Sequence, residues 1–434
     1  MPPKESADLL IAARWVLPML PVNTALADHA VVVTAGRIVA IGPEAQMSAK
    51  FAARERIVRA DHALLPGFVN AHTTAAATLL RGTSRATVGA QRFAGPDFVR
   101  DGTKIAIAEM LRAGITCFAD SGLFPEEAAR VAAAAHVRAA IGLPVSDEPT
   151  VWAESPTEHL AKAEQLWDTY RSSPWVSLYF APPTAAAISD ATLSRLRRVA
   201  DELDARVAMP VHESAAHVQD SIARDGHRPL QRLQALGLLR PGFSAIHLTQ
   251  LDESDFEIVA RTGLCVVACP QSDLRLSGGS CPVARLDSNR VTVGLGTDAP
   301  VGGGALDILA ETRVAALLAG PAGNTAASGL TAEGALRMAT LGGAIALGLS
   351  SLIGSIEPDK AADLVCFDLS GIEFEPRVRP AEAIVFAATR SQVSDVWTSG
   401  RAAVSGGRLL AFDELETLAL ARQWAERIRL ESVA

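Results

Sequence analysis

The sequence predicts an α/β fold: a (β/α)₈ barrel with a small β-sandwich domain formed by both ends of the chain. The length of 434 residues exceeds one average domain and fits a large barrel plus a smaller module. Between residues 63 and 298, eight apolar segments alternate with helical patterns rich in alanine and leucine. Strand-like segments also occur near both termini. We therefore predict a sandwich part at 1–62, the barrel at 63–352, and a second sandwich part with a terminal helix at 353–434.

The predicted sandwich strands come from distant parts of the chain. Asp8–Ala13 and Ala30–Ala35 are apolar or alternating, and Gly36–Gly42 has the pattern of a hairpin partner. Ala362–Asp368 and Asp395–Gly400 have the same character near the other end. We expect these terminal segments to meet as one small β-sandwich built from both ends of the chain.

The predicted barrel strands are nearly continuous in apolar residues, as expected for parallel strands buried on both faces. Helical patterns such as Lys104–Ala113, Asp190–Leu203 and Glu253–Thr262 separate them. Eight successive units of this kind favour a closed barrel over an open sheet. In order, the predicted strands are Ala63–His72, Ile115–Asp120, Arg138–Val145, Val176–Pro182, Val207–Glu213, Ser244–Gln250, Cys265–Pro270 and Val291–Asp298.

The chain should end in an amphipathic helix. Leu415, Leu418, Ala421, Ala425 and Ile428 recur at helical spacing, which predicts one apolar stripe facing the rest of the protein.

Composition and charge narrow the classes of function. The formal net charge is −8 and no basic stripe appears, which argues against a nucleic-acid partner. The five cysteines show no disulfide framework, as is typical of a reducing cytosol. No signal peptide or uninterrupted membrane-spanning segment is recognisable. We therefore expect a soluble, cytoplasmic protein without a membrane partner.

Polar residues end several of the predicted barrel strands. In a (β/α)₈ barrel the functional residues gather at the carboxyl ends of the strands. A packed strand has no folding reason to end on histidine or a carboxylate, so the set predicts a functional site. Its members are His72, Asp120, Glu213, His247 and Asp298.

Several segments resemble the amidohydrolase superfamily, and more narrowly its methylthioadenosine/S-adenosylhomocysteine deaminases and related chlorohydrolases. The first is Leu65-Pro-Gly-Phe-Val-Asn-Ala-His72, which resembles the first barrel strand of that group. The likeness spans nearly the whole chain. It continues through Leu79–Gly82, Ile105–Leu111, Ala245–Gln250, Cys269–Leu276, Gly294–Asp298 and Ile353–Val365.

The resemblance implies a metal site and shows where this chain departs from it. The family binds its ion through His-x-His on the first strand, a histidine on the fifth and an aspartate on the eighth. His72 and Asp298 match two of these positions, whereas Thr74 and Pro210 replace two histidines. A hydroxyl is a poor substitute for imidazole, and proline has no side-chain donor. Two donors form a weak chelate, so we expect no tightly bound cofactor and at most weak binding of zinc or iron.

The family's proton-transfer positions are retained. Glu213 matches its proton-shuttling glutamate, and His247 matches its sixth-strand histidine. His212 is adjacent to Glu213 and by strand alternation should face the other way, so it does not replace the lost ligand. Pro183 and Ala268 also stand where the family usually carries histidines.

Three hypotheses follow from this pattern. The first is a catalytically impaired or repurposed homologue, a pseudoenzyme that binds a purine nucleoside-like or heterocyclic ligand. The alternative is an active hydrolase of C–N bonds, a deaminase or cyclic amide hydrolase with a remodelled site, either metal-free or metal-bound. The third is a structural component of an assembly, because members of this group self-associate; the chain would then form a homo-oligomer or join an active paralogue.

Overall fold

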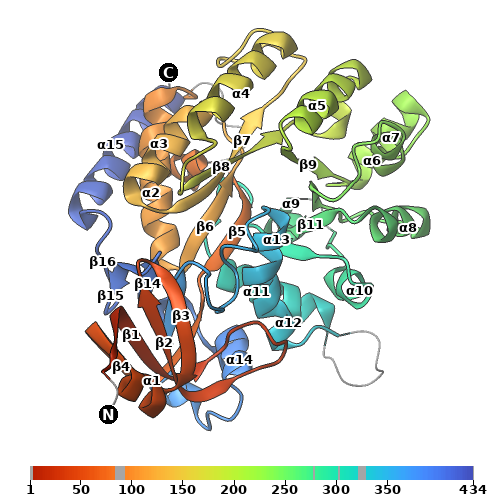
Figure 1. The fold of residues 1–434 in the computed structure, drawn as a ribbon. Helices are drawn as coiled ribbons and strands as arrows, with labels where there is room; N and C mark the ends of the chain where they lie inside the picture. The colour runs from red at the N-terminus through yellow and green to blue at the C-terminus, as the bar shows by residue number, and fades with distance from the viewer. Residues whose placement is uncertain (1–2, 84–92, 277–278, 302–303, 321–328, 434) are drawn as a thin grey trace.

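The protein is described by a computed structural model that covers residues 3–83, 93–276, 279–301, 304–320 and 329–433. Eight parallel strands form the central barrel, in the sheet order β12-β11-β10-β9-β8-β7-β6-β5 (Figure 1). The predicted barrel is therefore confirmed. The strands are β5 (Phe68–Thr73), β6 (Ile115–Asp120), β7 (Arg138–Pro144), β8 (Val176–Ala181), β9 (Arg206–Val211), β10 (Phe243–His247), β11 (Cys265–Ala268) and β12 (Val293–Leu295).

The ring of strands closes between β5 and the residues that follow β12. The backbone N–H groups of Thr297 and Asp298 donate to the carbonyl of His72, at 3.0 and 3.1 Å. Gly296 permits this approach, because a Cβ atom there would lie 2.8 Å from the backbone oxygen of His72. Barrel closure thus places Asp298 beside His72.

Helices surround the barrel and connect its strands (Figure 1). Their apolar faces join the strands in the largest hydrophobic core. The helices between the barrel strands are α2 (Pro96–Arg112), α3 (Pro125–Ala135), α4 (Pro156–Tyr170), α5 (Asp190–Glu202), α6 (Ala215–Asp225), α7 (Pro229–Ala235), α8 (Glu253–Thr262), α9 (Pro270–Leu276) and α10 (Val283–Ser288). After β12 follow α11 (Ile308–Ala319), α12 (Ala332–Arg337) and α13 (Gly343–Ala346).

Both ends of the chain join a second sheet of eight strands, in the order β16-β15-β14-β13-β4-β1-β2-β3. The pairing of β1 with β4 is parallel and the other pairings are antiparallel. This confirms that the two termini build one module. Its elements are β1 (Glu5–Val16), β2 (Leu26–Thr34), β3 (Arg37–Pro43), α1 (Glu44–Lys50), β4 (Phe51–Pro66), β13 (Leu364–Asp368), α14 (Pro380–Glu382), β14 (Val393–Thr398), β15 (Arg401–Ser405) and β16 (Arg408–Leu409).

The junction between the two sheets lies inside the predicted first strand. Residues up to Pro66 pair with β13 in the terminal sheet, and the barrel strand begins at Phe68. Gly67 stands at the break, where a Cβ atom would lie 2.1 Å from the hydroxyl of Thr116. A buried ion pair between Arg138 of β7 and Asp363 also joins barrel and sheet at 2.8 Å. The domain boundaries at 62/63 and 352/353 stay predictions.

The terminal helix α15 (Glu414–Val433) packs through a face that coincides only in part with the predicted stripe. Trp424 and Ile428 are buried, whereas Leu415 is 79% exposed. Trp424 makes an edge-to-face contact with Phe98 at 5.4 Å, and its indole N–H donates to Asp101 at 2.9 Å. The predicted stripe is therefore wrong at Leu415, Leu418 and Ala425, which are all exposed. In Figure 1 the helix lies alongside α2.

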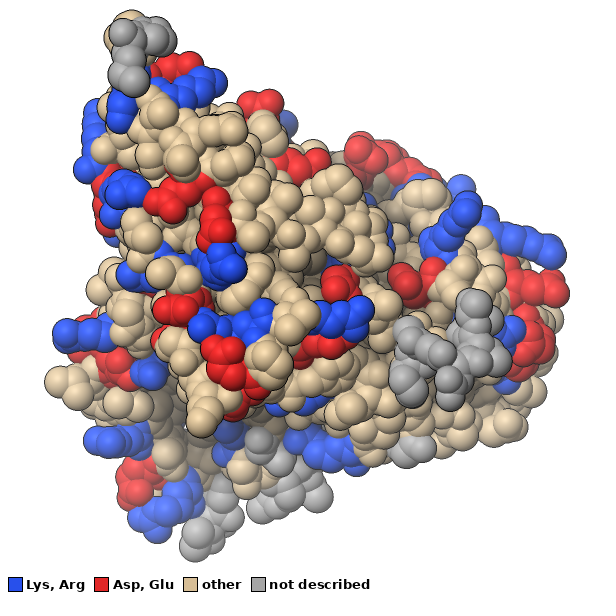
Figure 2. All heavy atoms as spheres, turned by 90° about the horizontal axis from the view of Figure 1, so that it is seen from below, with Lys and Arg blue, Asp and Glu red and all other residues tan. Residues whose placement is uncertain are grey.

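Charges of both signs are interspersed on the face drawn in Figure 2. That face carries no extended basic patch of the kind that binds nucleic acid. Among the described residues, no helix combines the length and hydrophobicity needed to cross a bilayer.

Candidate active site

Three buried side chains with metal-binding atoms meet at the carboxyl ends of the barrel strands. His72 comes from β5, His247 ends β10, and Asp298 follows β12. One nitrogen or oxygen atom from each lies within 4.8 Å of the others. His72 Nε2 is 3.6 Å from Asp298 Oδ1, and the two imidazole rings meet edge to face with centroids 6.1 Å apart. The structure thus unites the three residues that the sequence placed at separate strand ends.

The backbone at this site is unusual for residues with side chains. His247 has φ of +77° and Asp298 has φ of +54°, a region that few residues other than glycine adopt. Such conformations persist only where the surrounding structure enforces them. Here the β5–β12 closure fixes Asp298, since Thr73 Oγ1 also donates to its carbonyl at 3.0 Å.

Asp298 is held as a carboxylate. Burial alone would raise the pKa of Asp298, but a hydrogen bond and charge from His72 lower it well below its usual range. Ser272 reinforces the effect because its hydroxyl donates to Asp298 Oδ2 at 2.5 Å. An ionised carboxylate is the form that binds a cation.

His247 is oriented by a carboxylate behind it. Its Nδ1–H donates to Asp273 Oδ1 at 2.7 Å, which leaves Nε2 as the nitrogen available to a ligand. Burial lowers the pKa of His247, but the hydrogen bond and charge of Asp273 more than offset this and raise it. Asp298 and Glu213 add to the raised pKa. The negative field that favours a proton here also favours a metal ion.

The donor set suits a divalent metal ion. Two imidazoles and one carboxylate match the three protein ligands of catalytic zinc sites, which keep a fourth position open. A carboxylate–histidine pair such as Asp273–His247 is the usual support for a metal-bound imidazole. His72 Nδ1 is also buried and has no hydrogen-bond partner in the described part of the chain. The residues therefore fit zinc or iron, the metals that the resemblance implied.

Thr74 and Pro210, the two departures from the family pattern, lie beside the elements that carry this group. Thr74 immediately precedes the short helix Ala75–Leu80, and Asp120 Oδ1 accepts from the N–H of Ala75 at 2.7 Å. Pro210 lies in β9, in register with Ile246 of β10. Neither residue belongs to the three-residue donor group.

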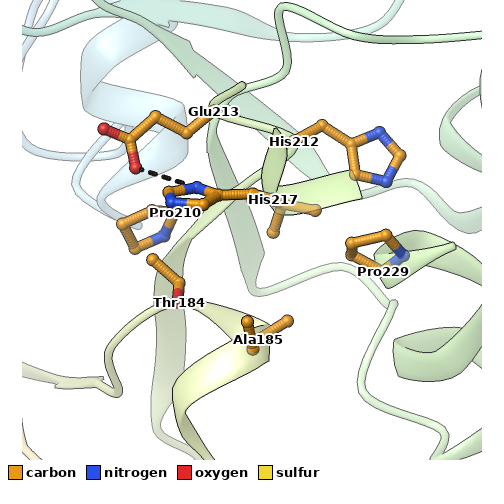
Figure 3. A pocket seen from close by; sticks show the side chains of 9 residues that line it. Thr184, Ala185, Pro210, His212, Glu213, His217 and Pro229 are labelled. Atoms are coloured by element: carbon orange, nitrogen blue, oxygen red, sulfur yellow. Dashed lines mark ion pairs between the residues drawn. The ribbon is translucent and has the colours of Figure 1, made fainter. Parts of the chain in front are cut away.

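Glu213 lies in a neighbouring pocket that Pro210, Thr184 and His217 also line (Figure 3). Glu213 Oε2 is 3.5 Å from His217 Nδ1 of α6, one helical turn away. His212 lines the same pocket, but β9 ends at Val211, so strand alternation does not apply to it. Its Nε2 accepts from the N–H of Leu230, and its Nδ1 is 3.5 Å from Asp255. Burial, followed by the charge of Arg228, lowers the pKa of His212 to about 3.

Sequence reasoning missed Ser272, Asp273 and His217 as site residues. Ser272 and Asp273 lie inside the segment Cys269–Leu276, which carried the resemblance, and an aspartate there was the available signal. They lie in the first turn of α9, and Glu311 of α11 holds that helix in place. Its Oε2 accepts from the backbone N–H of Gln271 at 2.9 Å, and its Oε1 accepts from the side-chain amide at 3.0 Å.

Glu311 should make stability depend on pH. Burial raises the pKa of Glu311 from 4.5 to about 8 although its bonds with Gln271 lower it. The folded state binds this proton more tightly than the unfolded chain, so stability falls as pH rises from about 4.5 to about 8. We expect the free energy of unfolding of Glu311→Gln to exceed that of wild type by about 1–3 kcal/mol at pH 8.5 and to be almost equal to it at pH 5.

Urea unfolding at the two pH values measures this difference. Glu164→Gln, on an exposed position of α4, is the matched control and should follow wild type. A constant gap between wild type and Glu311→Gln at both pH values would show that Glu311 is ionised in the folded protein.

Comparison with known proteins agrees with the resemblance. The model of the amidohydrolase family matches residues 63–403. A 5-methylthioadenosine/S-adenosylhomocysteine deaminase from Teredinibacter turnerae is 38% identical and covers 97% of this chain and 98% of its own length. The deaminase of the same name from Saccharophagus degradans is 35% identical, and the match covers 99% of this chain and 98% of the deaminase.

Solved structures show the same fold. An adenosine deaminase from Xanthomonas campestris with bound zinc superposes with a TM-score of 0.95 at 42% identity, covering 99% of this chain and 100% of its own. An atrazine chlorohydrolase from Arthrobacter aurescens, complexed with zinc, has a TM-score of 0.86 at 23% identity, covering 96% and 100%. That lower identity supports the fold alone. Taken with the match to the family model, these similarities show that the chain belongs to the amidohydrolase family.

Proposed function

We propose that this protein is an active hydrolase of C–N bonds, a deaminase of purine nucleoside-like substrates, with a remodelled metal site. His72, His247 and Asp298 would hold the ion. The observation that carries the proposal is the convergence of these three buried donors within 4.8 Å, with Asp273 behind one of them. The sequence alone suggested two donors, because it assigned His247 to proton transfer. The third donor brings the count to that of catalytic zinc sites.

The substrate class follows from the relatives. Two deaminases of methylthioadenosine and S-adenosylhomocysteine, and an adenosine deaminase with bound zinc, match nearly the full length of the chain at 35–42% identity. The substrates in the names of these relatives share an adenosine unit, and deamination of that unit releases its exocyclic amine as ammonia. We extend this class of substrate to the present chain.

The residues divide the chemistry between them. A bound zinc or iron ion supplies Lewis acidity, which lowers the pKa of water from about 15.7 towards about 7. Glu213 takes the proton from the attacking water and returns it to the departing amine. The C–N bond breaks, a C–O bond forms, and ammonia leaves. His217, whose side chain is 41% exposed, lies 3.5 Å from Glu213 and lines the same pocket.

The test is release of ammonia from methylthioadenosine, S-adenosylhomocysteine and adenosine by protein supplied with zinc, iron or manganese. We expect turnover of at least one substrate and a loss of about 10²-fold or more in Glu213→Gln. Equal rates for Glu213→Gln and wild type would exclude the assigned proton transfer. Absence of turnover in all three metals would exclude the function.

A second candidate is supported by Thr74 and Pro210. If the three remaining donors bind metal too weakly, the chain would be a ligand-binding homologue with impaired chemistry. Elemental analysis separates the two, because the impaired homologue would carry no metal while still binding the nucleosides in a calorimetric titration.

A further inference from the structure

Glu213 lies in a short turn between β9 and α6, and the shape of that turn places its carboxylate. β9 ends at Val211, and Ser214 is the N-cap of α6, where its hydroxyl accepts from the N–H of His217 at 3.3 Å. His212 opens the turn with φ of +52°, in the left-handed region. Figure 3 shows that the side chains of His212 and Glu213 point away from one another. The backbone of this turn therefore decides whether Glu213 reaches the pocket.

The imidazole of His212 attaches the turn to α7 and α8. Its side chain is fully buried, and its Nε2 accepts from the N–H of Leu230, in the first turn of α7, at 3.4 Å. Because burial lowers the pKa of His212 to about 3, the ring is neutral and its single proton lies on Nδ1. Nδ1 is 3.5 Å from Asp255 Oδ2 of α8. These contacts hold His212 in a backbone conformation that persists only where the surroundings enforce it.

Thr249 holds the same turn from β10. Its backbone N–H donates to the carbonyl of His212 at 3.1 Å. Its hydroxyl lies 3.0 Å from that carbonyl oxygen and 2.9 Å from the carbonyl oxygen of Glu213, so its one proton is shared between two acceptors. Thr249 follows closely after His247, one of the three metal-binding donors. The bonds of Thr249 thus fix the backbone of Glu213 relative to the strand that carries this donor.

We propose that His212 and Thr249 are positioning residues that hold the carboxylate of Glu213 at the reacting atoms of the substrate. This inference rests on the proposed function, in which Glu213 transfers the proton. Both nitrogens of His212 face protein groups, so it acts through the turn and not on the substrate. Proton transfer needs heavy atoms within hydrogen-bond reach, and a displacement of about 1 Å can lower the rate by about 10²-fold. A loosened turn should therefore lower kcat while metal binding and KM change little.

Thr249→Val and His212→Phe test this, because each removes the polar group and keeps much of the side-chain volume. In metal-loaded, full-length protein we expect kcat for ammonia release to fall about 10–100-fold in each variant, with KM changed less than about threefold and metal content unchanged. Thr249→Ser keeps the hydroxyl and should retain most of the wild-type kcat. His159→Phe is the matched control. It removes another buried imidazole, which donates to the carbonyl of Pro144 at 3.0 Å, and should leave kcat unchanged.

A double-mutant cycle shows whether the two residues act through Glu213. In a Glu213→Gln background, Thr249→Val and His212→Phe should lower the remaining rate less than about twofold, because the group that they position no longer transfers a proton. A full additional loss in that background would overturn the inference. An unchanged kcat in Thr249→Val or in His212→Phe, with Glu213 intact, would remove that residue from the positioning role.

Crystal structures of the variants give a readout that does not depend on catalysis. We expect the carboxylate of Glu213 to move by about 1 Å or more in Thr249→Val and in His212→Phe. A carboxylate that stays in place in both variants would exclude the positioning role, whether or not the protein releases ammonia. A displaced carboxylate in a protein whose wild type releases no ammonia would support the positioning role and exclude only the proposed function.

Discussion

Asp298→Asn should leave a folded protein that has lost its metal and at least about a thousandfold of its deaminase rate. The change removes the only anionic donor from the group formed with His72 and His247. A neutral amide oxygen is a much weaker ligand for zinc or iron than a carboxylate. Without the ion, the attacking water would return to a pKa of about 15.7, beyond what Glu213 alone can restore.

Folding should survive this substitution because the amide is nearly isosteric with the carboxylate. Ser272 still has an oxygen to which its hydroxyl can donate, and the backbone bonds that close the barrel on His72 do not involve the changed side chain. Asp168→Asn is the matched control, since that carboxylate of α4 is 76% exposed. Metal content by mass spectrometry and ammonia release measure the outcome. Full occupancy in Asp298→Asn would remove this residue from the metal site.

The fold was largely predictable because burial dictates its sequence pattern. Strands covered on both faces are apolar throughout, so continuous apolar runs were enough to predict the eight barrel strands. The start of the first barrel strand could not be predicted, because Ala63–Pro66 continues the apolar run of Phe68–Thr73 although the two stretches belong to different sheets. On α15, the predicted stripe left out Trp424, which is buried and whose indole N–H donates to Asp101.

The site was predictable only where strand ends defined it. His72, His247 and Asp298 could be named because closed barrels bring their carboxyl ends together. Their joint role as donors depends on side-chain direction. That direction is set by left-handed backbone at His247 and Asp298 and by the bond from His247 to Asp273. The spacing of residues predicts neither the left-handed backbone nor this hydrogen bond. The sequence therefore indicated only two metal ligands.

Restoring the two family histidines should have the opposite effect to Asp298→Asn. We expect Thr74→His combined with Pro210→His to lower the dissociation constant for zinc at least about tenfold and to raise metal occupancy towards one ion per chain. Thr74 stands two residues after His72, and Pro210 lies beside β10, the strand that ends at His247. New imidazoles at these positions start from the two strands that already flank the donors.

Neither single substitution should reach the effect of the pair, because each adds one donor. Pro210→His also adds a backbone N–H group to β9, which is paired with a strand on each side. This N–H must find a hydrogen-bond acceptor, or the substitution lowers the stability of the protein. Thr169→His, on the exposed face of α4, controls for adventitious binding by an added imidazole. Zinc affinity is measured against a competing chelator. An affinity unchanged in the double variant would mean that His72, His247 and Asp298 already saturate the ion, so that the threonine and proline reflect remodelling of the site around three ligands and not its decay.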